Sequence, residues 1–413
     1  MVLSAAGDDP GLKQHVAGTH RVVSPDHTLQ RLNPLRRALG ITRVANITGL
    51  DRIGMPVVTV IRPNSRSLAV AQGKGIDLAA AKVSGMMEAL ECHHAEHVHQ
   101  PLLFGSSQEL ADHHRLWPTR DLPRSGWQQF DPQRRIHWVE ASHAISHDHG
   151  WLPLELVSAD FTLPMPAGAG CFACNTNGLA SGNHPLEALC HALCEVIERD
   201  ATTLWKKLSA DEHAASGLDL ASVEDAPCRE LLAMFEDAAI DVTVWDVTSD
   251  VGVPAFYCLI CDAQHAYSDP EFGAGCHPCR EIALLRALTE AAQARLTFIA
   301  GVRDDIGPEC YLPAARARRE RVCGALRMEH QPRRRFGDLP SFEAGDLMRD
   351  WEWLLGCLER AGLPDIHVVD LGRADTPFAV VKVIVPGLEG LDDDAHGGYV
   401  PGPRARRLMG LAQ

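Results

Sequence analysis

Residues 84–91 have the sequence SGMMEALE, and residues 192–199 have the sequence ALCEVIER. In each predicted helix a Glu-x-x-Glu step places two carboxylates on one face, Glu88 with Glu91 and Glu195 with Glu198. Their neighbours are mostly apolar, and buried carboxylates repel one another unless a cation neutralises them. Two such helices facing each other predict a four-carboxylate site for hard divalent cations that carry a nucleotide triphosphate. The pattern indicates an ATP-using enzyme.

The composition narrows the class of protein. The chain has 413 residues and a formal net charge of −15, which allows two or three lobes and disfavours general nucleic-acid binding. No apolar run approaches the roughly 20 residues of a membrane span, and the polar start lacks a signal-peptide pattern. A cytoplasmic protein is therefore expected, with its 13 cysteines reduced and mostly packed in the core.

Hydrophobic periodicity predicts an α/β (α+β) protein in four parts. These are an N-terminal arm (1–40), a core with the acidic helices (41–305), a charged loop or lid (306–340) and a C-terminal α/β part with a Gly/Pro-rich extended tail (341–413). The predicted helices cover residues 78–97, 185–207, 280–300 and 347–361. The clearest predicted strands cover residues 55–62, 241–247, 253–261, 366–371 and 378–385. Asn183 is predicted to cap the second helix.

The second acidic helix carries a polar stripe. Asn183, Glu187, His191, Glu195 and Glu198 follow one another at steps of four, four, four and three residues. Charged helix faces usually meet solvent, so a solvated stripe is one interpretation. Asn and His suit a purely solvating face poorly, which favours a functional stripe.

Two further segments offer cations to a phosphate. The GKG segment at 73–75 precedes the first acidic helix and could place Lys74 against phosphate, although it lacks Walker A spacing and also suits an ordinary turn. Arg286 lies four residues before Glu290 in the third predicted helix. The two residues could form an ion pair worth a few tenths of a kcal/mol. Alternatively, Arg286 could bind phosphate through its planar guanidinium.

Cysteines and histidines leave other interpretations open. The three Cys-x-x-Cys pairs are Cys171/Cys174, Cys258/Cys261 and Cys276/Cys279. Two pairs could hold zinc, but the middle one lies in a predicted strand, where residues three apart point to opposite faces. The CHPC segment resembles a redox step without the expected βαβ context. His93 and His97 have ligand spacing, and without a third ligand they indicate a surface patch.

Several segments together resemble the YcaO family. The resemblance rests on GKGIDLAAAKVSGMMEALE (73–91), SGNHPLEALCHALCEVIERDA (181–201), LLRALTEAAQARL (284–296) and GVRDD (301–305). The segments GITRVANITGLDRIGMPV (40–57), VPGLEG (385–390) and VPGPR (400–404) resemble the branch that works with a TfuA-type partner.

The resemblance implies a YcaO-type fold with ATP between long helices packed on mixed sheets. By position, the implied Mg²⁺ ligands are Glu88, Glu91, Glu195 and Glu198. The implied nucleotide contacts are Lys74, Ser84, Asn183, Arg199, Arg286 and Glu290, followed by Glu187, His191 and Gln293. Glu195, Glu198 and Arg199 are the implied catalytic residues.

The implied chemistry is ATP-dependent O-phosphorylation of a backbone amide in a precursor peptide or protein. With sulfide from a donor and a TfuA-like partner the product is a thioamide, and with a neighbouring Cys, Ser or Thr it is an azoline. A non-catalytic zinc-binding or substrate-docking component is the alternative of another class. A homodimer is among the assemblies that this interpretation allows.

Two departures from the family pattern stand out. The first Glu-x-x-Glu step is followed by Cys92, where the family often has Arg. The chain ends in VPGPRARRLMGLAQ rather than in the Pro-x-Pro-x-Pro terminus of azoline-forming members. The second departure favours thioamide formation.

Overall fold

The computed structural model describes residues 9–262, 269–390 and 398–411. The helices are α2 (Pro25–Leu32), α3 (Leu78–Glu96), α4 (Ser107–Leu110), α5 (Pro185–Trp205), α6 (Ala210–Ala215), α7 (Ala226–Asp237), α8 (Arg280–Ala300), α9 (Pro313–Glu329), α10 (Leu347–Arg360) and α11 (Pro403–Leu408). The strands are β1 (Arg43–Asn46), β2 (Val57–Ile61), β3 (Val70–Lys74), β4 (Leu102–Gly105), β5 (Ile136–His143), β6 (His149–Pro153), β7 (Leu179–Gly182), β8 (Leu218–Asp219), β9 (Ile240–Asp246), β10 (Ala255–Asp262), β11 (Glu271–Cys276), β12 (Arg334–Arg335), β13 (His367–Asp370) and β14 (Ala379–Ile384).

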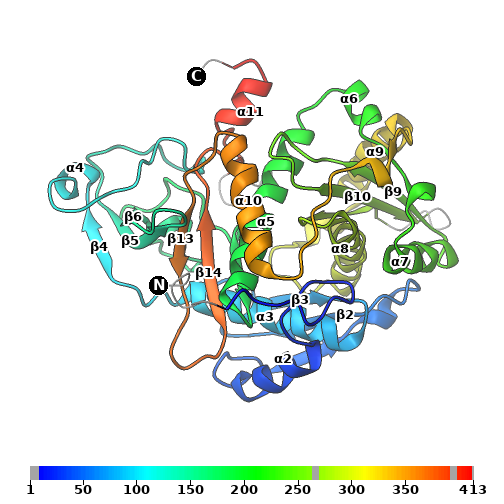
Figure 1. Ribbon diagram of the computed structural model, residues 1–413, viewed down its shortest axis with the longest axis horizontal. Helices are drawn as coiled ribbons and strands as arrows, with labels where there is room; N and C mark the ends of the chain where they lie inside the picture. The colour runs from blue at the N-terminus through cyan, green and yellow to red at the C-terminus, as the bar shows by residue number, and fades with distance from the viewer. Residues whose placement is uncertain (1–8, 263–268, 391–397, 412–413) are drawn as a thin grey trace.

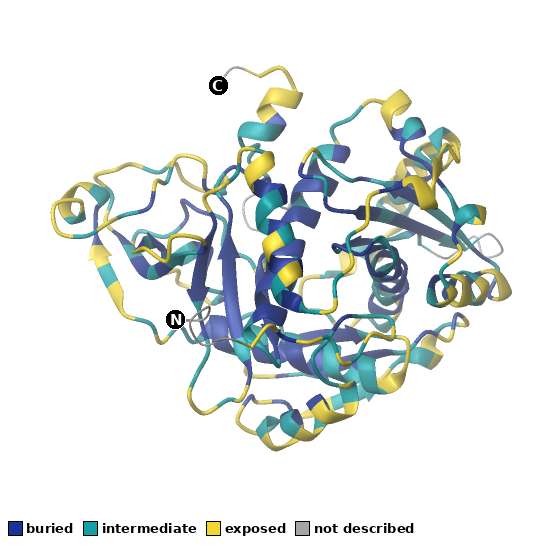
Figure 2. Cartoon of the chain, viewed as in Figure 1, coloured by how far each residue is buried: buried dark blue, intermediate teal, exposed yellow. Residues whose placement is uncertain are grey.

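Three antiparallel sheets organise the molecule. One has the order β1-β2-β3, a second has the order β11-β10-β9, and a six-stranded sheet has the order β4-β5-β13-β14-β7 with β6 paired to β5. Figure 1 shows α5 beside the large sheet, α8 beside the β9–β10 sheet and α3 beside β2 and β3. Figure 2 shows that these strands and the facing sides of the helices form the buried core. The predicted α/β (α+β) class is confirmed.

One strand of each sheet leads directly into one of the three long helices. Strands β3, β7 and β11 are followed directly by α3, α5 and α8, and each strand packs against its helix through a glycine. A Cβ added at Gly73 would lie 2.0 Å from the backbone oxygen of Ala81, and one added at Gly275 would lie 2.1 Å from that of Ala283. Both contacts fall on the fourth residue of the following helix. The strand–helix pairs are therefore built alike.

A Gly73→Ala variant tests this close packing. The free energy of unfolding should fall by about 2 kcal/mol or more, because the new methyl group meets backbone that cannot move aside. Gly324→Ala is the matched control, since nothing lies within 4 Å of its added Cβ in α9, and it should gain up to about 1 kcal/mol. Urea unfolding of both variants measures the difference. Equal losses would contradict the packing described.

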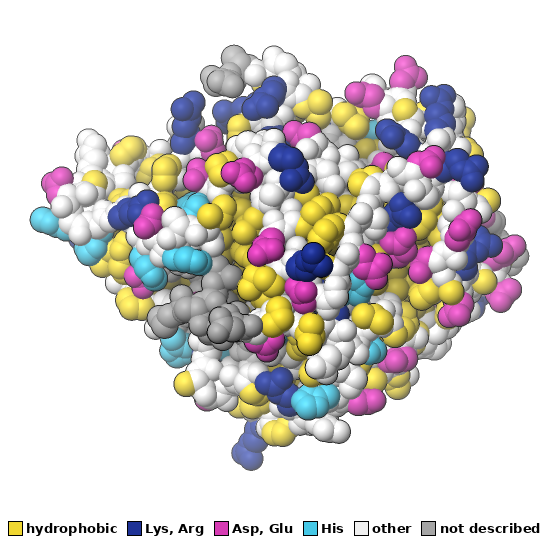
Figure 3. Space-filling model, in the orientation of Figure 1, with side chains coloured by type: hydrophobic (Ala, Val, Ile, Leu, Met, Phe, Trp, Pro, Cys, Tyr) yellow, Lys and Arg dark blue, Asp and Glu magenta, His cyan; other side chains and the backbone are white. Residues whose placement is uncertain are grey.

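The predicted mobile segment is largely helical. Residues 306–340 were expected to form a charged loop or lid, and α9 occupies Pro313–Glu329 instead. Its Ala, Arg and Leu content favours helix without an apolar stripe, and ion pairs support it, such as Arg316 to Glu320 at 2.9 Å and Arg319 to Asp269 at 2.6 Å. Figure 3 shows charges of both signs interspersed over this face.

Both ends of the described chain pack against the core. The predicted arm, of which residues 1–8 lie outside the described residues, contains α2 and is held by a buried 2.6 Å ion pair between Lys13 and Asp350. The tail was expected to be extended, but it ends in α11, whose first N–H groups donate to the Glu389 carboxylate. That carboxylate replaces the missing helical acceptors. Within the described residues, no helix is long and apolar enough to cross a bilayer.

Candidate active site

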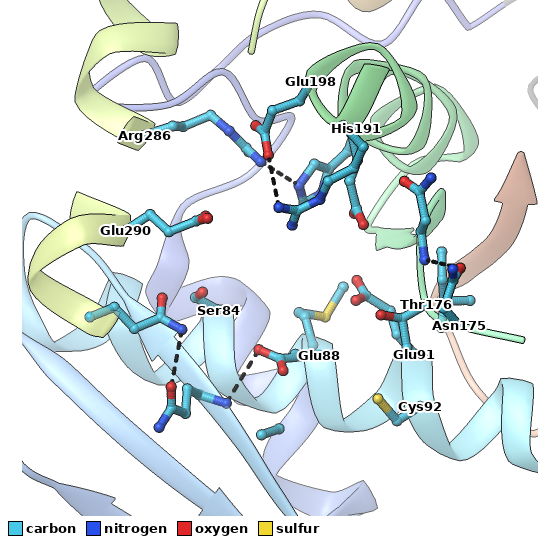
Figure 4. Close-up of a pocket in the computed structure, with 18 of the residues that line it drawn as sticks. Ser84, Glu88, Glu91, Cys92, Asn175, Thr176, His191, Glu198, Arg286 and Glu290 are labelled. Carbon is cyan, nitrogen blue, oxygen red and sulfur yellow. Dashed lines mark hydrogen bonds and ion pairs between the residues drawn. The ribbon is translucent and has the colours of Figure 1, made fainter. Parts of the chain in front are cut away.

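The three long helices place acidic side chains around one cavity of about 1250 Å³. Glu88 and Glu91 are the eleventh and fourteenth residues of α3, and Glu195 and Glu198 hold the same positions in α5. In α8 these positions are Glu290 and Gln293, which line the same cavity. Figure 4 shows Glu88, Glu91, Glu198 and Glu290 directed toward a common space. The fold thus brings the sequence-predicted acids together.

Among the described residues, the one ion pair made by the four predicted metal ligands is that of Glu198 with Arg199. Glu88 accepts a hydrogen bond from the backbone N–H of Gln72 (3.2 Å), and Glu91 accepts from the N–H (2.8 Å) and hydroxyl (2.7 Å) of Ser181. Glu198 is 2% exposed, its Oε1 lies 3.8 Å from the Arg199 guanidinium, and its Oε2 has no hydrogen-bond partner among the described residues.

Burial shifts the protonation of these acids. It raises the pKa of Glu88 to about 7 and, with the nearby Glu88 and Glu195 charges, the pKa of Glu91 to about 8. Burial also raises the pKa of Glu195 and of Glu198. The raised pKa values show that the ionised form of these carboxyls is unfavourable in the cavity. A bound divalent cation would stabilise the ionised form.

Cationic side chains line the same cavity. The Lys74 ammonium lies 2.7 Å from Glu290, and despite burial Lys74 and Arg199 hold the pKa of that carboxyl at about 2. Arg286 donates to Nε2 of His191 (3.1 Å), and burial beside this cation keeps the pKa of His191 well below its usual value. The Arg286 Nε is buried with no partner among the described residues, so it remains available to a phosphate oxygen.

The remaining predicted ligands also line this cavity, namely Ser84, Asn183, Glu187, Arg199 and Gln293. Lys74 lies at the end of β3, so the GKG segment is not a simple turn. Asn183 does not cap α5, because His184 accepts the capping bond from Leu186. The Asn183 side chain instead accepts from Arg31 (2.9 Å) and donates to Thr28 (3.0 Å).

Glu187 holds the N-terminal arm against the cavity. Its two carboxylate oxygens accept the backbone N–H groups of Val22 (2.6 Å) and Asn183 (2.7 Å). A Glu187→Gln variant should release the arm, because an amide can accept only one of these bonds well, at a cost of about 1–3 kcal/mol. Tryptic cleavage after Lys13 and Arg21 should become about 10-fold faster. An unchanged rate would mean that Glu187 does not hold the arm.

Comparison with known proteins identifies the family of this chain. Residues 72–389 match the family model described as YcaO cyclodehydratase, ATP- and Mg²⁺-binding. The chain belongs to the YcaO family. ATP and Mg²⁺ are the cofactors of this family, and the resemblance stated from the sequence motifs is confirmed.

Curated YcaO relatives cover nearly the full chain. A Rhizobium leguminosarum bv. trifolii protein, described as an uncharacterized protein in the tfuA 3′ region, is 35% identical over 96% of this chain and 94% of its own. An uncharacterized protein of Methanothermobacter thermautotrophicus is 34% identical over 89% and 95% of the two chains.

Solved YcaO-type structures share the fold. YcaO from Methanopyrus kandleri bound with AMPPCP and Mg²⁺ has a TM-score of 0.75 and 24% identity, and the match covers 95% of this chain and 98% of that chain. A heterocyclase in complex with substrate and cofactor has a TM-score of 0.78 and 23% identity over 97% of this chain. This chain spans only 56% of the heterocyclase chain.

Sequence patterns missed several cations of the YcaO cavity, Arg21 and Arg303 among them. Arg21, from the N-terminal arm, lines the cavity next to Glu187 and Arg286, yet no motif surrounds it. Arg303 also lines the cavity, and its position in the GVRDD segment was the available signal. Both lie near helix termini or in loops, where hydrophobic periodicity carries no information.

The cysteine pairs find no geometric support as zinc sites among the described residues. All 13 cysteines are free, and no metal-capable group of three among the described residues includes one. His93, Glu96 and His97 do cluster, but Glu96 is already bonded to the Arg62 guanidinium and to Ser67. A cation there would have to displace Arg62.

Proposed function

We propose that this chain installs a thioamide in the backbone of a peptide or protein, using ATP and Mg²⁺ and a TfuA-like partner. The observation that carries the proposal is the Rhizobium relative, which shares 35% identity over 96% of this chain and is described by its place in the tfuA 3′ region. The place of that relative beside tfuA supports a TfuA-like partner for this chain. We expect the enzyme to work in the cytoplasm, where ATP is available.

The residues of the cavity fit the two cofactors. The buried Glu198 Oε2 and the Arg286 Nε lack partners among the described residues, one suited to a cation and the other to a phosphate oxygen. We assign Mg²⁺ to Glu88, Glu91, Glu195 and Glu198, and the nucleotide to Lys74, Ser84, Asn183, Arg199, Arg286 and Glu290, with His191 and Gln293 beside them.

When bound, ATP supplies the phosphoryl group that makes the amide oxygen a leaving group, and Mg²⁺ screens its charge. Neutral His191 accepts a hydrogen bond from Arg286 and so orients its guanidinium. The guanidinium can then donate two hydrogen bonds to phosphate oxygens. Lys74 is paired with Glu290, which keeps the ammonium aimed into the cavity. Glu187 holds the N-terminal arm, and residues 17–19, 21 and 23 of that arm line the cavity.

Part of the cavity lies beyond these residues and suits a peptide. Residues 120–125, 173–177 and 398–403 line it and contain none of the assigned metal ligands. The substrate backbone would enter there, with its amide directed toward the acidic helices.

Azoline formation is the second candidate, favoured by the cyclodehydratase description of the family and by the fold shared with a heterocyclase. Reconstitution separates the two. Purified chain, a TfuA-like partner, ATP, Mg²⁺, sulfide and a precursor peptide from the same genome are combined, and the peptide is analysed by mass spectrometry. An oxygen-to-sulfur exchange that requires sulfide supports the proposal. Loss of water without sulfide would replace it with azoline formation.

A further inference from the structure

A single charged side chain interrupts the apolar strand β14. Lys382 is 1% exposed, and its Nζ donates to the backbone oxygen of Asn175 at 2.6 Å. An ammonium carries three donors. In the part of the chain that the structure describes, the bond to Asn175 is the hydrogen bond that Nζ makes, and Nζ forms no ion pair with a carboxylate. A buried charge without a counter-ion is costly, and burial accordingly lowers the pKa of Lys382 to about 8.

The acidic groups near Lys382 already serve other partners. Glu195 from α5, Cys174 from the loop before β7 and Cys92 from α3 act on it at longer range. Glu195 belongs to the acidic cluster of the cavity. Glu389 is also nearby, but its carboxylate accepts hydrogen bonds from the Tyr399 hydroxyl and from backbone N–H groups of the tail.

A small cavity of about 30 Å³ lies beside the Lys382 side chain. Apart from Lys382, its wall contains apolar side chains such as Leu156, Ala173, Val196 and Leu388, and it also contains Asn175, Asn177 and Glu389. The volume holds one water-sized or slightly larger species and excludes phosphate. The Glu389 oxygens are taken up by hydrogen bonds from the tail, which leaves the Lys382 ammonium as the charged donor at this cavity. An ammonium among largely aliphatic side chains suits a weakly hydrated monovalent anion, because such an ion loses little hydration on entry.

The small cavity adjoins the large one. The two cavities share part of their walls, namely residues 123, 173, 175, 177 and 388–390. Figure 4 shows Asn175 and Cys92 on the same side of the large cavity as Glu91. An anion beside Lys382 would therefore be stored next to the region where the substrate amide would lie.

We propose that the cavity beside Lys382 binds one monovalent anion and that this anion is hydrosulfide, the nucleophile of the reaction. The inference rests on the proposed function for the identity of the anion. Binding is non-covalent: Lys382 donates hydrogen bonds to the sulfur, and no bond forms or breaks. The site holds the nucleophile apart from the acidic cluster until the amide is in place.

Bromide is the probe, because its anomalous scattering locates it directly. Crystals grown in sodium bromide should show a peak at hydrogen-bond distance from Nζ of Lys382, and added hydrosulfide should remove it. Lys382→Met crystals should show no peak. No peak in the wild type, or a peak that persists in Lys382→Met, would overturn the site. A peak that hydrosulfide does not displace would mean an adventitious ion only and would overturn the assignment.

An Ala173→Val variant keeps the charge and fills the cavity, so it serves if Lys382→Met does not fold. It should lose the bromide peak with Lys382 in place. In the reconstituted reaction, Lys382→Met should raise the sulfide concentration for half-maximal rate by about 10-fold or more, with the ATP dependence unchanged. Unchanged sulfide dependence in a working thioamide reaction would overturn this inference alone. An intact anion site without thioamide product would overturn the proposed function alone.

Discussion

Replacing Glu198 with Gln should reduce Mg²⁺-dependent ATP binding by about 100-fold or more while leaving the fold as stable or more stable. Glu198 is 2% exposed and its Oε2 has no hydrogen-bond partner among the described residues. Without a bound cation, its buried charge therefore lowers the stability of the fold. The amide has the same shape and no charge. Isothermal titration of ATP with Mg²⁺ measures the binding, and thermal unfolding measures the stability.

The matched control is Glu359→Gln, which changes an exposed glutamate on α10 far from the cavity lining. It should bind ATP like the wild type and unfold at the same temperature. Tight Mg²⁺-dependent binding by the Glu198→Gln variant would remove Glu198 from the metal ligands. Loss of binding together with loss of stability would show that Glu198 serves the fold rather than the cofactor.

The second large effect is a pH dependence that Mg²⁺ and ATP suppress. Without them, the free energy of unfolding should fall as pH rises from about 5 to about 8. The pKa values of Glu88 and Glu91 are about 7 and about 8 in the folded chain against 4.5 for an ordinary glutamate, so the folded state binds more protons in this window. Their stabilisation is complete below about pH 4.5 and is lost as pH passes about 8, on the order of 3 kcal/mol for each group.

Histidines act in the opposite direction, because burial lowers the pKa of His20 and His94 to about 4. A Glu91→Gln variant separates the two effects, since it removes one carboxyl and leaves the histidines. Urea unfolding at pH 5, 6.5 and 8 should show a smaller decline for the variant than for the wild type. Saturating Mg²⁺ and ATP should flatten the wild-type curve. Parallel curves for both proteins would rule out the raised pKa of Glu91.

The long helices could be predicted closely, and the reasons are local. The predicted helix 280–300 matches α8 at both ends, where Gly301 adopts a left-handed conformation (φ 59°) that stops the helix. The predicted helices 78–97 and 185–207 begin where α3 and α5 begin. Local pattern failed for α9, whose support comes from ion pairs to Asp269 and Asp241 far away in the chain.

The acidic site was predicted in part for the same reason. Glu88, Glu91, Glu195 and Glu198 were visible because each pair sits in one helix, where spacing fixes the face. Arg21 and Lys382 were not, because a lone cation in an arm or a strand has no spacing to mark it. The Glu-x-x-Glu step is absent from α8, because Gln293 occupies the position at which α3 and α5 have their second glutamate.

The meeting of three sheets at one cavity has a consequence for how motion spreads through the molecule. Each sheet sends one helix to the site, so a ligand held by all three adds a further link between units that already touch, as Ser181 does with Glu91 and Lys74 with Glu290. Hydrogen exchange should therefore slow in β3, β7 and β11 together when Mg²⁺ and ATP bind, although none of the three strands pairs with another. The bound cofactor would couple the three helices. A substitution in one helix that weakens cofactor binding would therefore also reduce hydrogen-exchange protection in the other two.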